Sequence, residues 1–257
     1  MAADVNSFGP VEVDAFHRDG YVIVRQLIPR EYVAAMKRVT LRDLDLHQGD
    51  VEYEADLRYP GAPESLDAEG GRTIRRLRQA ISRDPVFCRL LGERFLLNRL
   101  RQLLGDHVVM PLAHHNCVMT KHPRFSSDTG WHQDIRYWAF QSPELVSLWI
   151  ALGQESVANG CLRVLPGTHR QPVPLDRLDA EQFLRTDLAE NQALLKTAVP
   201  VELEVGDALF FHARCFHAAT RNFSSETKHS VVFTFRALEN SPLPGTRSSS
   251  LPELLLS

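Results

Sequence analysis

The sequence lacks long apolar runs and contains little cysteine. No stretch of about eighteen consecutive apolar residues occurs among its 257 residues, so no membrane-spanning segment is predicted. Residues 1–10 contain no basic segment followed by an apolar one, so no secretory signal is predicted either. The four cysteines are scattered, at Cys88, Cys117, Cys161 and Cys215. Their spacing argues against a zinc knuckle or a disulfide framework and favours reduced thiols in the cytoplasm.

An excess of charge of one sign is also lacking. The chain has 29 Lys and Arg against 32 Asp and Glu, a formal net charge of -3. This balance provides neither a field that attracts nucleic acid nor a polybasic anchor for a membrane surface. Hydrophobic residues make up 44% and charged residues 24%, which excludes a disordered or fibrous chain. We therefore expect one globular domain spanning residues 1–257 and a small-molecule partner.

The first hundred residues carry mainly helical patterns. Helices are predicted at 11–19, at about 29–45 and at 85–104, with a strand at 21–27. Residues 47–71 have no periodicity, which is typical either of a lid over a binding site or of a mobile segment. A cluster of arginines with helical spacing follows, at Arg72, Arg75, Arg76 and Arg78. It predicts a solvated helix face, although one of these arginines could hold an anionic substrate.

Strand patterns replace helical ones beyond residue 106. Short runs rich in branched and aromatic residues, separated by Gly, Pro, Asn and Asp, occur at 108–120, 146–152, 161–165, 198–205, 208–213 and 230–237. Strands at this spacing, without intervening helices, indicate an antiparallel sandwich or barrel. The apolar tail at 251–257 is predicted to pack on its own subunit or on a neighbour.

The stretch Gly130-Trp131-His132-Gln133-Asp134 is the best candidate for chemistry. In an extended segment residues i and i+2 leave the same face, so His132 and Asp134 can reach one point together. One more imidazole from a distant strand would give two histidines and a carboxylate, which suits Fe(II) and leaves coordination positions open. His212 and His217 both qualify, and spacing does not separate them. Zinc on the same ligands would need a nearby general base, and no distinctive candidate is present.

Several motifs follow one another along the chain. They are FHRDGYVIV at 16–24, WHQD at 131–134, WIAL at 149–152, NGCLRVLPGTH at 159–169, and GDALFFH at 206–212 continuing to HAATRN at 217–222. In content and order they resemble the phytanoyl-CoA dioxygenase family of Fe(II)- and 2-oxoglutarate-dependent oxygenases, from about residue 14 to 237. The resemblance implies a mainly β fold with flanking helices. Its core would be a double-stranded β-helix (jelly-roll, cupin-like) at about 106–240, behind a helical N-terminal part at about 1–105.

The resemblance also implies a ligand set for iron. The metal would be held by His132, Asp134 and His217, because the family's distal ligand precedes the small-residue and Asn segment. His212 and His169 then become structural residues. Dioxygen and 2-oxoglutarate are the implied co-substrates.

A departure from the family occurs where 2-oxoglutarate would bind. The family commonly uses an Arg two residues before a Ser to hold the far carboxylate of this oxo acid, and this chain has Lys228 before Ser230. Lysine is a point charge that cannot make a bidentate fork, so Arg221 or Lys121 could share the work. Residues expected either to wall this pocket or simply to fill the barrel core are Trp149, Thr129 and Met119.

The implied reaction converts 2-oxoglutarate to succinate and CO2 while an unactivated C–H bond of a small-molecule metabolite is hydroxylated. Retention of Asp134 favours hydroxylation or another oxidation of this class over halogenation, since related halogenases carry a small residue there. Two alternatives are a catalytically silent jelly-roll binding or sensor protein, and a cupin-like metalloenzyme that needs no oxo acid. The sequence does not name the substrate, because family members act on acyl-CoAs, amino acids and secondary metabolites.

Overall fold

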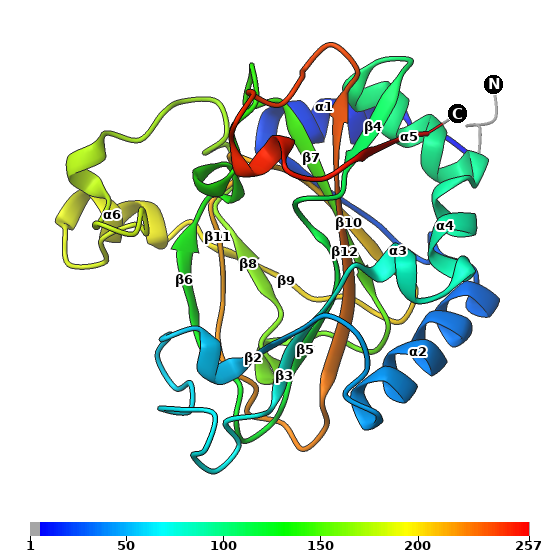
Figure 1. Ribbon diagram of the computed structural model, residues 1–257. Coiled ribbons are helices and arrows are strands. Elements are labelled where there is room, and N and C mark those ends of the chain that lie inside the picture. Colours follow the sequence, from blue (N-terminus) through cyan, green and yellow to red (C-terminus); the bar gives the residue numbers. More distant parts are fainter. Residues whose placement is uncertain (1–5, 257) are drawn as a thin grey trace.

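The computed structural model describes residues 6–256 and is built mainly from antiparallel strands (Figure 1). Residues 1–5, the beginning of the segment without a signal pattern, and residue 257 at the end of the apolar tail lie outside the described residues. In the described range the larger of two sheets has nine strands. In spatial order its main path is Tyr21–Val24 (β1), Ala208–His212 (β10), Leu145–Ala151 (β7), Lys228–Ala237 (β12), Asn116–Lys121 (β5), Ile74–Arg78 (β3) and Val51–Tyr53 (β2). Off this path, Val108–Pro111 (β4) pairs with β12, and Glu253–Leu256 (β13) pairs with β4.

The smaller sheet faces the larger one and carries part of the metal cluster described below. Its order is Thr129–His132 (β6), His217–Ala219 (β11), Leu162–Val164 (β8) and Val199–Val201 (β9). All of its pairings are antiparallel. In Figure 1 these strands stand opposite β12 and β10.

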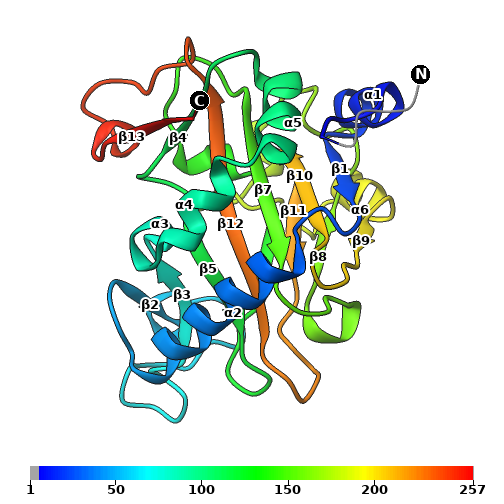
Figure 2. The ribbon, with the colours of Figure 1, turned by 90° about the vertical axis from the view of Figure 1, so that its right-hand side faces the viewer.

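Helices cover the outer face of the larger sheet. They are Pro10–Asp19 (α1), Arg30–Asp45 (α2), Ala80–Arg83 (α3), Pro85–Leu91 (α4), Arg94–Leu104 (α5) and, away from that face, Ala189–Leu195 (α6). Figure 2 shows α2, α4 and α5 in front of β12 and β7. Single 3-10 turns are Glu54–Asp56 (η1), Asp134–Tyr137 (η2), Val157–Asn159 (η3), Leu175–Arg177 (η4) and Arg247–Ser249 (η5). Among the described helices none is long and apolar enough to cross a lipid bilayer.

The central strands β7 and β12 are buried on both faces. Ile150 and Val231 point to one side, into a core shared with the helices. Trp149 and Val232 point to the other side, into a core between the two sheets. Successive side chains of a strand leave opposite faces, so two covered faces require a continuous apolar run. The sequence has such runs at these strands, which is why both were predictable.

Two predicted elements differ from the structure, each for its own reason. The stretch with helical arginine spacing is the strand β3, which pairs with β2 on one side and β5 on the other. The predicted helix at 85–104 is two helices, because Glu93 is extended (φ -71°, ψ 132°) and interrupts the helical backbone after Gly92. For β3, pairing along the sheet outweighed the local helical pattern.

The segment at 47–71, in which the sequence showed no periodicity, contains the strand β2 and the turn η1. The tail packs on its own chain, as β13 on β4. The division into a helical N-terminal part and a jelly-roll core stays a prediction, and β1, β2 and β3 from that part lie in the larger sheet.

Candidate functional site

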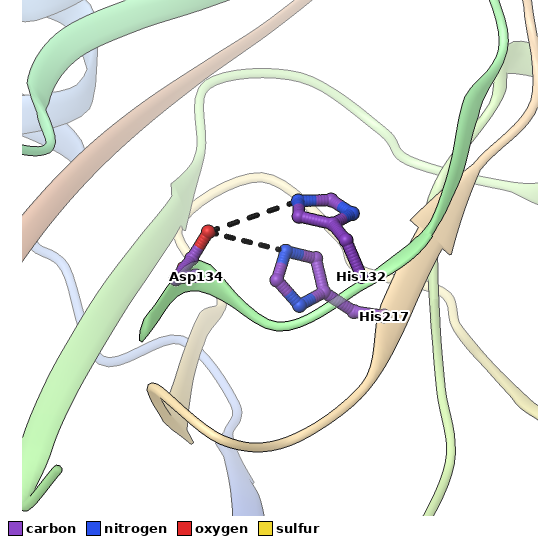
Figure 3. Close-up of side chains that lie close together, drawn as sticks. All are labelled: His132, Asp134 and His217. Atoms are coloured by element: carbon purple, nitrogen blue, oxygen red, sulfur yellow. Dashed lines mark ion pairs between the residues drawn. The ribbon is translucent and has the colours of Figure 1, made fainter. Parts of the chain in front are cut away.

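Three buried donor side chains converge between the sheets (Figure 3). His132 ends β6, and His217 lies directly opposite it on β11. The strand ends at His132, but Gln133 continues the extended backbone (φ -110°, ψ 136°) and Asp134 begins η2. The side chains of His132 and Asp134 therefore reach the same point, as their two-residue spacing predicted. Asp134 Oδ1 is 3.8 Å from His132 Nε2 and 3.6 Å from His217 Nε2. The structure therefore joins the three side chains that the sequence placed in one cluster.

Backbone carbonyls orient both imidazoles. His132 Nδ1 is 2.8 Å from the carbonyl oxygen of Gly130, and His217 Nδ1 is 3.1 Å from that of Cys215. A carbonyl can only accept, so we assign the ring proton to Nδ1, which leaves the Nε2 lone pairs facing Asp134. Burial lowers the pKa of both histidines, and proximity to His217 lowers that of His132 further. Both are thus neutral, as metal ligation requires.

The carboxylate of Asp134 is ionised. Burial alone would raise its pKa, but the charge of His115 and the hydrogen bond that it donates outweigh burial and hold the pKa well below its usual range. One donor atom from each of the three residues lies within 4.8 Å of the others. Two neutral imidazoles and a carboxylate are a donor set that suits Fe(II) and leaves positions open. The residues present therefore fit an iron ion.

His115 is a site residue that sequence reasoning missed. It lies in the turn between β4 and β5, and its Nε2 is 3.1 Å from Asp134 Oδ1. Burial would lower the pKa of His115, but the Asp134 carboxylate raises it to about 9. The imidazolium donates to the carboxylate and orients it, as partners behind metal ligands do. No sequence spacing connects residue 115 to 132 or 134, so only the fold reveals the contact.

Glu155 gathers the residues that were expected to bind the co-substrate. Its buried carboxylate accepts hydrogen bonds from Trp149 Nε1 at 2.9 Å, Ser230 Oγ at 2.6 Å and Lys228 Nζ at 2.9 Å. Lys228 and Trp149 border the cavity that contains the metal cluster, whereas Glu155 and Ser230 lie behind them. Sequence reasoning missed Glu155, which is a single acidic residue in a turn and 73 residues from its lysine partner.

The remaining expected residues divide into two groups. Lys121, Thr129 and Met119 border the same cavity as the metal cluster. Lys121 is buried and donates to the carbonyl oxygen of Ser127 at 2.8 Å. Arg221 does not reach the cavity, because its partly exposed guanidinium is paired with Asp128 at 2.9 Å.

Residues 16–230 match the sequence pattern of a family described as phytanoyl-CoA dioxygenase (PhyH). The chain belongs to the phytanoyl-CoA dioxygenase family. Membership confirms the predicted class of enzyme, an Fe(II)- and 2-oxoglutarate-dependent oxygenase, and the buried cluster of two histidines and an aspartate fits its iron.

Curated relatives in this family align with nearly the whole chain. The ectoine dioxygenase of Streptomyces coelicolor is 25% identical over 251 residues, which covers 90% of this chain and 80% of that protein. The phytanoyl-CoA dioxygenase domain-containing protein 1 of Bos taurus is 23% identical over 270 residues and 90% of each chain. The similarity therefore extends well beyond the metal motif.

Solved structures confirm the predicted fold class. EctD from S. alaskensis, solved with 2-oxoglutarate and 5-hydroxyectoine, superposes with a TM-score of 0.76 over 98% of this chain and 84% of that chain, at 20% identity. The epimerase SnoN, solved with Fe3+, alpha ketoglutarate and nogalamycin RO, has a TM-score of 0.72 over 94% and 89%, at 21% identity. This phytanoyl-CoA dioxygenase family member is thus mainly β, with a jelly-roll core and flanking helices.

A second cavity of about 490 Å³ opens next to the metal cluster. It shares five residues with the first cavity, namely Arg76, His115, Thr129, His132 and Asp134. Tyr59, Tyr137 and Trp138 line it further out. A space of this size suits one small molecule, so a substrate bound there would lie beside Asp134.

Proposed function

We propose that this family member hydroxylates a C–H bond of a small-molecule metabolite, using dioxygen and 2-oxoglutarate. The observation that carries the proposal is the buried cluster of His132, Asp134 and His217, with two lysines bordering the same cavity. Bound iron would supply the oxidation, in which 2-oxoglutarate becomes succinate and CO2 while the second oxygen atom of dioxygen enters the substrate C–H bond.

The protein's part is to hold, orient and shield. His132 and His217 present Nε2 because carbonyls hold Nδ1, and His115 fixes Asp134. The aromatic lining of the second cavity would exclude water around the substrate.

Two ammonium groups support binding of the far carboxylate of 2-oxoglutarate. The charge of Lys228 is already balanced by Glu155. Lys121 has no carboxylate within ion-pair distance among residues 6–256, although it is buried. A buried cation without a counter-ion is costly, and an incoming carboxylate would supply one. We therefore assign this carboxylate to Lys121 and Lys228 together.

Replacement of Lys228 by methionine is expected to raise the 2-oxoglutarate KM about tenfold to a hundredfold, because a charge-assisted hydrogen bond is lost. The affinity for Fe(II) should change much less, since Lys228 contacts no metal ligand. Arg221→Met is the matched control and should leave both constants unchanged. An unchanged KM in Lys228→Met, with folding verified by circular dichroism, would leave Lys121 as the sole carboxylate ligand.

Lys121 should make 2-oxoglutarate binding depend on pH. Burial, and then the positive charges of Arg75 and Lys228, lower the pKa of Lys121 to about 7. Below this pH the ammonium attracts the carboxylate, and above it the neutral amine does not. Both carboxyl groups of the oxo acid are ionised throughout this range. We expect the anaerobic Kd to rise by up to about tenfold per pH unit above pH 7. Lys121→Met should bind weakly without this rise, and a flat wild-type profile would contradict the assignment.

Succinate release with a metabolite panel tests the proposed function. Incorporation of oxygen from labelled dioxygen into the product would show hydroxylation. Ectoine dioxygenases and an epimerase share this fold, so the product has to be identified. Binding of Fe(II) and 2-oxoglutarate without any decarboxylation would favour the silent binding protein. Oxygen consumption without 2-oxoglutarate would favour the enzyme that needs no oxo acid.

A cytoplasmic location is the compartment we propose. Cys117, Cys161 and Cys215 are buried free thiols, and Cys88 is an exposed one. Reduced thiols of this kind are typical of proteins kept in a reducing compartment. Targeting of a fluorescent fusion of the full chain would test this location.

A further inference from the structure

We propose that Arg76 binds a carboxylate of the substrate, which makes the substrate a small carboxylic acid. This inference rests on the proposed function, because it concerns the molecule that fills the second cavity. The contacts of the arginine, its place in the sheet and the charges around the cavity carry it.

Sheet register places Arg76 on the inner face of the larger sheet. Ser230 of β12 is opposite Met119 of β5, and Met119 is opposite Arg76 of β3. Residues directly opposite in a sheet share a face, and Met119 packs in the core between the two sheets. Arg76 thus lies two strands, about 10 Å, from Ser230 on the same face. It borders both the metal cavity and the second cavity.

The guanidinium of Arg76 is incompletely partnered. Its neighbour Glu52 receives the hydrogen bond of Arg78 Nη2 at 2.7 Å. Arg76 Nε is 3.3 Å from Glu52 Oε1, but neither atom has a hydrogen-bond partner within the described part of the chain. An arginine fork offers paired donors that match the two oxygens of a carboxylate. Arg76 therefore has donors available at the border of the two cavities.

The other cations of the second cavity are engaged or peripheral. Arg78 is bound to Glu52. The Nε of Arg136 also lacks a hydrogen-bond partner within the described chain, but its Nη1 is held by the carbonyl oxygen of Glu181 and its guanidinium stacks on Phe183. Arg247 is exposed at the rim. One available fork suits a single carboxylate, whereas a phosphate ester is usually met by several donors. The aromatic side chains of the same cavity suit an apolar or flat body attached to that carboxylate.

The first test compares carboxylic acids with their own methyl esters. Succinate release from 2-oxoglutarate is measured with the iron-loaded full chain and a panel of small aromatic and aliphatic acids, each paired with its ester. We expect one or more acids to stimulate release and the matched esters to act at least about tenfold more weakly. Equal action of acids and esters, or no action of any acid, would overturn the assignment.

The second test uses variants to ask whether the preference for acid over ester depends on Arg76. Arg76→Gln should raise the concentration of acid that gives half-maximal stimulation by about tenfold or more, and should bring acid and ester close together. Arg76→Lys should recover part of the preference, because it keeps the charge without the fork. Arg72→Gln, at an exposed arginine of the same segment, should keep it in full. An intact acid preference in a folded Arg76→Gln would overturn the proposal.

The two proposals can fail separately. If the protein binds Fe(II) and 2-oxoglutarate and releases succinate but does not distinguish acid from ester, the proposed function stands and the proposed role of Arg76 fails. If the protein releases no succinate with any compound, and its spectrum does not change when 2-oxoglutarate is added to the Fe(II)-loaded protein, the proposed function itself fails.

Discussion

Alanine in place of His132 is expected to abolish iron binding and, with it, turnover. Fe(II) and 2-oxoglutarate together should give a weak visible charge-transfer band under anaerobic conditions. His132 Nε2 faces Asp134 and His217 in a buried cluster, and no other imidazole in the described chain joins the donor group. Mutation of a residue that only orients a metal ligand costs up to about a hundredfold in metal affinity. Loss of one of the three ligands themselves should therefore cost more than that.

Two further variants turn this result into a graded test. His115→Gln removes an orienting partner of Asp134 and should weaken iron by about tenfold to a hundredfold, while keeping the band at saturating metal. His107→Ala alters an exposed histidine outside the cluster and should leave both the band and the affinity unchanged. A band of full strength in His132→Ala would refute the ligand assignment.

The metal cluster was predictable because its information is largely local. His132 and Asp134 are two residues apart in an extended segment, and that spacing alone brings their side chains together. The choice of His217 over His212 needed the family resemblance. In the structure His212 lies away from the metal cavity and is 3.1 Å from Glu144, so its place at the end of β10 could not be read from spacing.

The end of the cavity that we propose for the co-substrate was only partly predictable. Lys228 could be found because it occupies a position that the family fills with arginine. Glu155 could not, because its contact with Lys228 depends on the pairing of β7 with β12 and on the turn that follows β7. Arg221 follows the distal histidine closely in sequence, yet Asp128 draws it away from the cavity. Sequence proximity indicates candidates, and the fold selects among them.

Arg76 shows how a chance periodicity misleads. Ile74, Leu77 and Ile81 fit the spacing of one helix face, and this pattern predicted an outward arginine. In the structure Ile81 lies in α3, and in β3 successive side chains leave opposite faces, so Leu77 enters the core beneath the helices while Arg76 faces the cavities. A short amphipathic run is compatible with either a helix or a strand, and pairing with β5 made this one a strand. The helical interpretation therefore placed Arg76, the residue that we propose binds the substrate, on a solvated surface.

Removal of the Glu155 side chain is expected to destabilise the protein strongly. Glu155→Ala would leave the Lys228 ammonium buried without its counter-ion, and the Nε1 of Trp149 and the hydroxyl of Ser230 would lose their acceptor. Breaking a buried pair from one side costs about 3–5 kcal/mol of unfolding free energy. For a chain of this size that corresponds to a fall in Tm of roughly 6–20 °C. Thermal and urea unfolding of the metal-free protein would measure it.

A double-mutant cycle separates the pair from its surroundings. Glu155→Gln keeps an acceptor for Trp149 and Ser230, and Lys228→Met removes the cation, so the double variant should be more stable than either single one. Arg124→Gln breaks the exposed pair with Glu69 and should leave stability unchanged within error. Strictly additive losses in the cycle would show that Glu155 and Lys228 do not depend on each other. Coupled losses would mean that the departure from the family's arginine was accommodated by a second residue, because a lysine at this buried position needs a carboxylate behind it to stay in place for the oxo acid.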